Sequence, residues 1–122
     1  MEGRLLDWIG RLREISETAA VIVEGKRDYQ LLKRLGVKNL YALSGKNYFD
    51  LLEELPEEIS EVVLLTDVDK QGERIFRKLK EIFESQGITV RGEFRRILKE
   101  LEVEEVEQLS EFFFGDPFKG KR

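Results

Sequence analysis

The sequence has no cysteine and no histidine in its 122 residues, and both absences narrow the chemistry open to it. Without cysteine there are no disulfides, no thiolate zinc sites and no thiol nucleophile. Without histidine there is no imidazole base and no histidine-ligated metal. Chemistry must therefore come from carboxylates, lysine, arginine, serine, threonine or tyrosine, and carboxylate-bound Mg²⁺ is the metal site that best fits this set.

No hydrophobic run approaches the length needed to span a membrane. No signal peptide is expected, because Glu2, Arg4 and Asp7 interrupt the first apolar residues. We therefore expect a cytoplasmic protein that makes no membrane contact.

Hydrophobic residues make up 41% of the chain and charged residues 38%, with one methionine and two prolines. This length and composition predict a single globular domain over residues 1–122. The strands and helices predicted below make up its core, over about 18–91. A helix over 3–16 precedes this core, and C-terminal helices and a tail over 92–122 follow it. The excess of glutamate, lysine and arginine is typical of thermophilic proteins.

The net charge is −4, but the charges are segregated along the chain. Residues 70–99 carry nine basic and four acidic side chains, whereas residues 50–61 carry six acids and no base. A second acidic run spans residues 100–111. A basic face on an acidic protein suits a phosphate-bearing partner, and a solvated helix with ion pairs is the plainer alternative.

Apolar runs alternate with amphipathic stretches through the middle of the chain. Strands are predicted at 19–24, 39–43, 61–66 and 88–91, and helices between them at 27–35, 48–55 and 71–84. This alternation predicts an α/β, Rossmann-like fold, a four-stranded mainly parallel sheet with helices on both faces. The order 2-1-3-4 is expected, because it makes neighbours of the first and third strands. These are the two strands that acidic residues follow.

Acidic side chains end the first and third predicted strands. Glu24 follows the first, and Asp67 and Asp69 follow the third. The carboxyl ends of parallel strands lie at one edge of a sheet, where ligands usually bind. Asp67 and Asp69 are two residues apart and point the same way if the segment is extended. We therefore predict that the three carboxylates converge on one or two Mg²⁺ ions, or on Mn²⁺ in their place.

The acidic motifs have three other possible interpretations. An EF-hand is rejected, because its twelfth position would be Lys78 and a strand precedes the loop. Asp67 alone is compatible with a helix N-cap, but this leaves Glu24 and Asp69 unexplained. A phosphatase with an Asp nucleophile normally carries its motif on the first strand, whereas this one follows the third.

A glycine-containing turn, Ser44-Gly45-Lys46, follows the second predicted strand. It is no P-loop, since the upstream glycine and the following Ser or Thr are missing. Gly45 and Lys46 are candidate phosphate contacts through backbone amides and charge. A structural turn without function remains the alternative.

The segments VIVEGKRD (21–28) and LLTDVDKQGERI (64–75) resemble the two signature motifs of the Toprim domain. This domain is shared by topoisomerases, bacterial-type primases, repair proteins and the nucleases that mature 5S ribosomal RNA. The resemblance covers about residues 18–91 and is greatest to small stand-alone archaeal Toprim proteins and to the 5S nuclease.

The resemblance implies roles for individual residues. Glu24 would be a general acid/base or a metal ligand, and Asp67 and Asp69 would hold Mg²⁺ against a phosphodiester. Further contacts to phosphate are implied for four basic residues that follow the acids, namely Lys26, Arg27, Lys70 and Arg74.

The function expected from these motifs is Mg²⁺-dependent phosphodiester chemistry on RNA or DNA, as in a nuclease. The alternative is a nucleic-acid-binding Toprim module without catalysis that acts with a partner protein. The Phe-rich tail over 112–122 is a candidate partner contact, and its docking on the domain itself is the favoured alternative.

Overall fold

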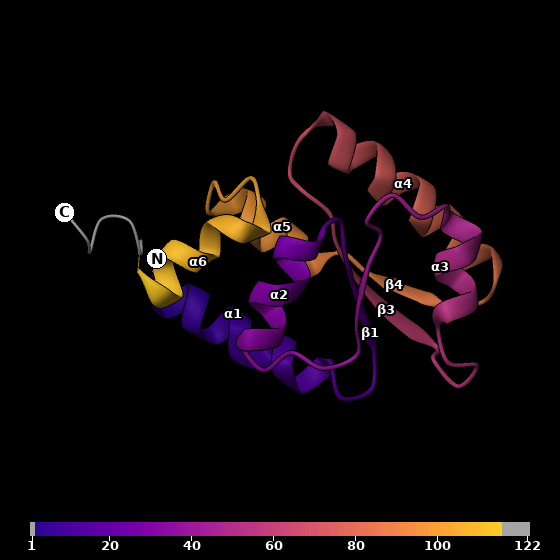
Figure 1. Cartoon of the computed structure of the whole chain (residues 1–122), viewed down its shortest axis with the longest axis horizontal. Helices are drawn as coiled ribbons and strands as arrows, with labels where there is room; N and C mark the ends of the chain where they lie inside the picture. The colour runs from indigo at the N-terminus through magenta and orange to yellow at the C-terminus, as the bar shows by residue number, and fades with distance from the viewer. Residues whose placement is uncertain (1, 116–122) are drawn as a thin grey trace.

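The structure is a computed structural model, and it describes residues 2–115 (Figure 1). Helices and strands alternate along most of the chain. Their order is α1 (Glu2–Ile15), β1 (Ala20–Val23), α2 (Lys26–Arg34), β2 (Leu40–Ala42), α3 (Tyr48–Glu54), β3 (Glu61–Leu65), α4 (Lys70–Ser85), β4 (Thr89–Arg91), α5 (Glu93–Glu100), the 3₁₀ turn η1 (Val106–Gln108) and α6 (Leu109–Phe114).

The four strands form one sheet in the order β2-β1-β3-β4, and all three pairings are parallel. The predicted α/β class, strand order and parallel character are therefore confirmed. In the register, Val23 lies opposite both Ala42 and Leu65, so β1, β2 and β3 end level with one another. The residues that follow these three strands consequently share one edge.

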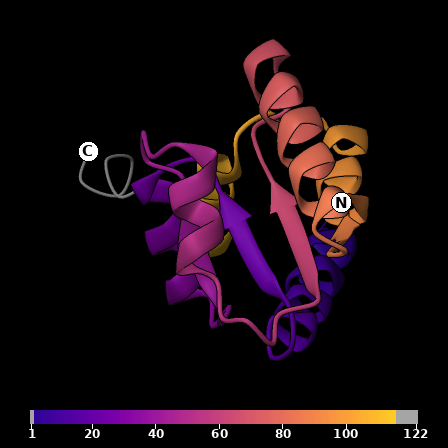
Figure 2. The ribbon, with the colours of Figure 1, turned by 90° about the vertical axis from the view of Figure 1, so that its right-hand side faces the viewer.

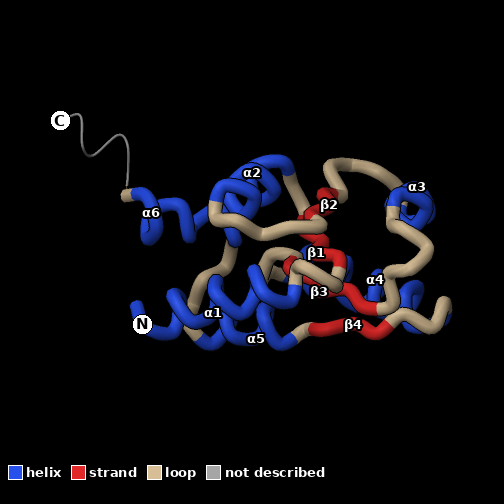
Figure 3. Tube along the Cα trace, turned by 90° about the horizontal axis from the view of Figure 1, so that it is seen from below, coloured by secondary structure: helices blue, strands red, loops and turns tan. Residues whose placement is uncertain are grey.

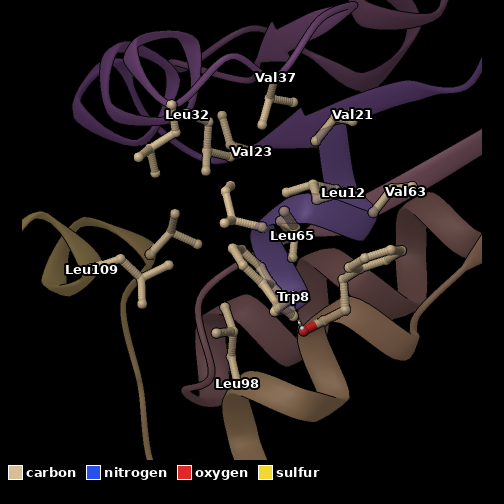
Figure 4. Close-up of a cluster of buried hydrophobic side chains, with 14 of the residues drawn as sticks. Trp8, Leu12, Val21, Val23, Leu32, Val37, Val63, Leu65, Leu98 and Leu109 are labelled. Carbon is tan, nitrogen blue, oxygen red and sulfur yellow. Dashed lines mark hydrogen bonds between the residues drawn. The ribbon is translucent and has the colours of Figure 1, made fainter. Parts of the chain in front are cut away.

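Two hydrophobic clusters cover the two faces of the sheet. One face packs against α1, α2 and α5, and the other against α3 and α4. Figure 4 shows the first cluster, in which Trp8 and Leu12 of α1 point toward Val23 and Leu65 of the sheet. In the two central strands, all four residues of β1 and residues 62–65 of β3 are buried, because helices cover both faces of the sheet. This burial explains the uninterrupted apolar runs in the sequence.

The helix α1 lies beside α5, and Figure 3 shows the two together along one side of the sheet. The indole of Trp8 donates a hydrogen bond to the carbonyl oxygen of Phe94 at 3.0 Å. Leu6 of α1 is 60% exposed, whereas Leu5 and Leu12 of the same helix are buried.

The region after α5 is not one continuous helix. Glu102 has a φ of 60°, which ends the helical pattern and turns the chain toward η1 and α6.

Phe112 and Phe113 pack partly buried against the main core, and Phe114 stacks on the guanidinium of Arg34 at 3.8 Å. These aromatic residues dock on the domain. Residues 116–122 of the predicted tail lie outside the described residues, and a protein partner there stays a prediction.

None of the helices within residues 2–115 is long and apolar enough to cross a membrane.

Candidate functional site

Glu24 and Asp67 meet where β1 and β3 end. The Oε1 atom of Glu24 accepts a hydrogen bond from the backbone N–H of Asp67 at 2.9 Å. Ser44 comes from the adjacent end of β2, and its N–H donates to the carbonyl oxygen of Glu24 at 2.8 Å. The carboxyl ends of three parallel strands thus contribute to one site, at the point where the strand order reverses.

A close approach of Gly72 to Asp67 shapes the loop after β3. A Cβ atom on Gly72 would collide with the carbonyl oxygen of Asp67, so only glycine fits there. The Thr66 hydroxyl, buried beneath the loop, donates to the carbonyl oxygen of Gly72 at 2.8 Å. These contacts bind the first turn of α4 to the end of β3.

Arg95 of α5 holds the same loop from the other side. Its guanidinium donates to the carbonyl oxygens of Thr66 (3.1 Å) and Asp67 (2.9 Å) and to the Glu73 carboxylate (2.7 Å). Arg95 is only 7% exposed, so these partners satisfy a buried cation. The hydrogen bond from Arg95 is also the main reason why the pKa of Glu73 is lowered.

Asp69 has a different position from Asp67. It is the N-cap of α4, and its Oδ1 atom accepts the N–H of Gly72 at 2.6 Å. The helix-cap interpretation therefore applies to Asp69 and not to Asp67. The positive end of the helix dipole also stabilises a carboxylate at this position.

Burial, together with the carboxylates around it, raises the pKa of Asp67 to about 7. Burial is the largest cause, and the negative charges of Glu24, Asp28, Asp69 and Glu105 add to it in that order. The pKa of Asp28 is raised as well, chiefly by burial. Oδ1 of Asp67 is buried and has no hydrogen-bond partner among the described residues.

This arrangement was tested for its fit to a divalent cation. Residues 2–115 contain no group of three or more acidic side chains close enough together to hold an ion as they stand. Mg²⁺, however, binds through one or two carboxylates and keeps several waters. An unpartnered Asp67 oxygen among like charges meets that requirement, with Glu24 beside it. The residues therefore fit a hydrated Mg²⁺ ion.

The comparisons with known proteins agree with this geometry. The family model of the Toprim domain matches residues 18–92, which contain β1 to β4 and all three predicted acids. The chain belongs to the Toprim family.

Relatives of this Toprim protein include small archaeal proteins named UPF0292. One from Methanosarcina barkeri is 36% identical over 87% of this chain and 78% of its own length. Another, from Methanocaldococcus jannaschii, is 35% identical over 75% of this chain and 73% of its own. A solved structure of a protein from Aquifex aeolicus superposes with a TM-score of 0.82 at 40% identity, covering 85% of this chain and 96% of that one. The resemblance to the 5S maturation nuclease stays a prediction.

The predicted phosphate contacts of the Toprim protein fall into two groups. Lys26 and Arg27, at the start of α2, line an open pocket with Glu24 and Asp67. Arg27 is well exposed and makes only a 3.9 Å ion pair with Glu107. These two side chains are the predicted contacts that lie at the acidic site.

The other predicted contacts lie outside this pocket. Lys70 and Arg74 are exposed on the first turns of α4. Gly45 has a φ of 81°, as a tight turn requires, and the position that a Cβ atom would take there is open space. Lys46 is held by Glu54, whose two carboxylate oxygens lie 2.9 and 2.7 Å from its Nζ. This pairing favours the structural interpretation of the turn.

Sequence reasoning missed Arg95, Asp28 and Glu105. Asp28 lies within the first motif and accepts the N–H of Gly25 at 3.2 Å, so the motif itself was a usable signal. Glu105 reaches the pocket because the N–H of Val68 donates a hydrogen bond to the carbonyl oxygen of Glu104 at 2.7 Å. Nothing in the spacing of the sequence indicates that contact.

Proposed function

We propose that this Toprim protein catalyses Mg²⁺-dependent phosphodiester chemistry on nucleic acid, as a nuclease does. The observation that supports it most is that two acids at strand ends, Glu24 and Asp67, lie together. Other carboxylates surround them, and the pKa of Asp67 is raised. Such clusters are stable at neutral pH when a cation or a proton neutralises them.

Asp67 and Glu24 would hold the metal, and Asp69 would contribute the carboxylate oxygen that is not engaged in capping α4. When bound, Mg²⁺ lowers the pKa of its water and neutralises charge on a phosphate. Lys26 and Arg27 orient a phosphate at the rim of the pocket. Glu24 is placed to take or supply a proton there, and Arg95 keeps the Asp67 backbone in position.

Cleavage assays test this proposal directly. Fluorescent structured RNA and single-stranded DNA are incubated with the protein in Mg²⁺ or in EDTA. The expected result is metal-dependent cutting that Asp67→Asn and Glu24→Gln each reduce by roughly 100-fold, the loss typical when one stabilising group is removed from a transition state.

Asp50→Asn and Glu58→Gln are the matched controls. Both residues are exposed and lie away from the site, in α3 and the loop after it, so both variants should cut at the wild-type rate. Cutting that survives in the two site variants would show that the activity belongs elsewhere and would contradict the proposal.

A second candidate is a Toprim module that binds nucleic acid without cutting it. The unpaired basic side chains of α4 and α5 favour binding independently of the acids. This function predicts binding that persists in EDTA and weakens with salt, with no metal-dependent product. A cytoplasmic location and thermophilic character accompany both candidates as predictions.

A further inference from the structure

Most basic side chains within residues 2–115 are already engaged, and all but one of the exceptions gather in one region. Arginines and lysines elsewhere within residues 2–115 pair with acids, carbonyl oxygens or aromatic rings, as Arg4, Arg13 and Lys46 do. Seven described basic residues have no such contact. Lys26 is at the acidic site, and the other six lie on α4 and α5: Lys70, Arg74, Lys78, Lys80, Arg96 and Lys99.

A groove lies between α4 and α5 at the β4 edge of the sheet. Figure 2 shows α4, in salmon, beside the orange segment that holds β4 and α5. Lys80 of α4 and Arg96 and Lys99 of α5 line this groove, here called the basic groove. All three side chains are exposed.

The acids of the basic groove do not cancel this charge. Glu73 is engaged by Arg95 at 2.7 Å and by Arg77 at 3.4 Å. Glu93 is engaged by Arg91 at 3.0 Å. Each acid is therefore neutralised by an arginine, and the three unpaired cations leave the groove positive on a protein of net charge −4.

The basic groove is joined to the candidate site through α4 and Arg95. The helix α4 begins directly after Asp69, and Arg95, which holds the Asp67 loop, also lines the groove. From Lys70 to Lys80 the helix rises about 15 Å at roughly 1.5 Å per residue. That length matches four to five nucleotides at about 3.4 Å each along one strand.

We propose that the basic groove and the adjoining face of α4 bind the sugar–phosphate backbone of a nucleic-acid strand that extends from the candidate site. The inference deepens the proposed function and rests on it for the identity of the ligand. The acidic run over residues 50–61, in α3 and the loop after it, would repel the same backbone. The strand is thereby directed along α4 and not along α3.

The test measures binding in EDTA, so that it does not depend on metal or on cutting. Fluorescence anisotropy with a labelled single strand and a labelled duplex compares the wild type with the double variant Lys80→Gln/Arg96→Gln over a range of salt. Losing two phosphate contacts should lower the slope of log affinity against log salt by about 1.8 for a duplex or about 1.4 for a single strand. Affinity at low salt should fall roughly tenfold or more.

Lys33→Gln/Lys38→Gln is the matched control, because it removes the same charge from exposed positions in and after α2. It should leave the slope unchanged. Equal losses of affinity in the two double variants would show an effect of net charge alone and would overturn the groove as the binding site. A wild type that binds no nucleic acid would overturn it as well. Polyglutamate that competes as well as the oligonucleotide would overturn a nucleic-acid ligand.

The two proposals fail separately. If Lys80→Gln/Arg96→Gln weakens binding but no substrate is ever cut, the basic groove stands and the catalytic proposal fails. If cutting depends on Asp67 while the double variant binds as the wild type does, the catalytic proposal stands and the groove is wrong.

Discussion

Gly72 shows how a single residue shapes the candidate site. It lies in the first turn of α4, where glycine is a poor helix former, yet a side chain there would collide with the Asp67 backbone. The collision is with main-chain atoms, which cannot move aside without moving the end of β3. Asp67 and the start of α4 are thus positioned by the absence of a Cβ atom at residue 72.

Replacing Gly72 by alanine should therefore destabilise the protein, by roughly 2 kcal/mol or more, although alanine is the better helix former. Gly10→Ala is the control, because Gly10 lies inside α1 with open space at its Cβ position. That change should stabilise by about 0.5 to 1 kcal/mol. Urea unfolding measures both, and equal stabilisation by the two substitutions would refute the close approach.

Arg95→Met tests the buried guanidinium. The substitution leaves the carbonyl oxygens of Thr66 and Asp67 without their donor, so the free energy of unfolding should fall by roughly 2 to 4 kcal/mol. The neighbouring Arg96→Met changes an exposed side chain and should alter stability by less than about 0.5 kcal/mol. Similar urea midpoints for the two variants would mean that Arg95 does not hold the loop.

At the scale of the element, Asp69 combines two tasks at the start of α4. Its Oδ1 caps the helix, and its charge contributes to the raised pKa of Asp67. Asparagine keeps a capping oxygen but removes the charge, whereas alanine removes both. The pair of substitutions separates the cap from the electrostatics.

Asp69→Ala should cost about 1 kcal/mol of stability, and Asp69→Asn should cost much less. If Asp69 is a metal ligand, both variants should weaken Mn²⁺ binding by similar factors, as measured by calorimetry. Mn²⁺ binding at wild-type affinity in Asp69→Asn would restrict Asp69 to its role as a cap and leave Glu24 and Asp67 as the metal ligands.

Much of this element order could be predicted from the sequence, since buried parallel strands appear as short apolar runs. The strand predicted at 61–66 is Glu61–Leu65, and the helix predicted at 71–84 is Lys70–Ser85. Glu24 and Asp67 could be paired because both follow such runs. The cap at Asp69 was not separable from a ligand role, because both use a carboxylate at a strand end. Arg95 and Glu105 reach the site only through tertiary packing, which leaves no periodic signal.

At the scale of the whole molecule, the protein separates its charges around the sheet. Carboxylates gather at the carboxyl edge of β1 and β3, and unpaired cations lie on α4 and α5. On the two proposals above, a divalent cation at the first place and a polyanion at the second would each stabilise the folded protein by binding to it. Its stability should therefore respond to both ligands and to pH.

The pH response can be worked out from Asp67. Its pKa in the folded protein is about 7, above the ordinary value of 3.8. Between these two pH values the folded state therefore holds a proton that the unfolded chain has already lost. The stabilisation from that proton is fully present below about pH 4 and is lost as the pH rises through about 7. In EDTA, the group therefore makes the protein less stable at pH 8 than at pH 6.

Mg²⁺ should largely remove this difference, because it binds the ionised carboxylates that repel one another at pH 8. At a concentration one hundred times its dissociation constant, it should add about 2.7 kcal/mol to the free energy of unfolding, and clearly less at pH 6, where a proton competes at Asp67. Thermal unfolding with Mg²⁺ or EDTA at both pH values measures the effect. Asp67→Asn should remove both the pH dependence due to this group and most of the Mg²⁺ shift, whereas Asp50→Asn should keep them. An equal Mg²⁺ shift in Asp67→Asn and the wild type would place the cation elsewhere on the protein.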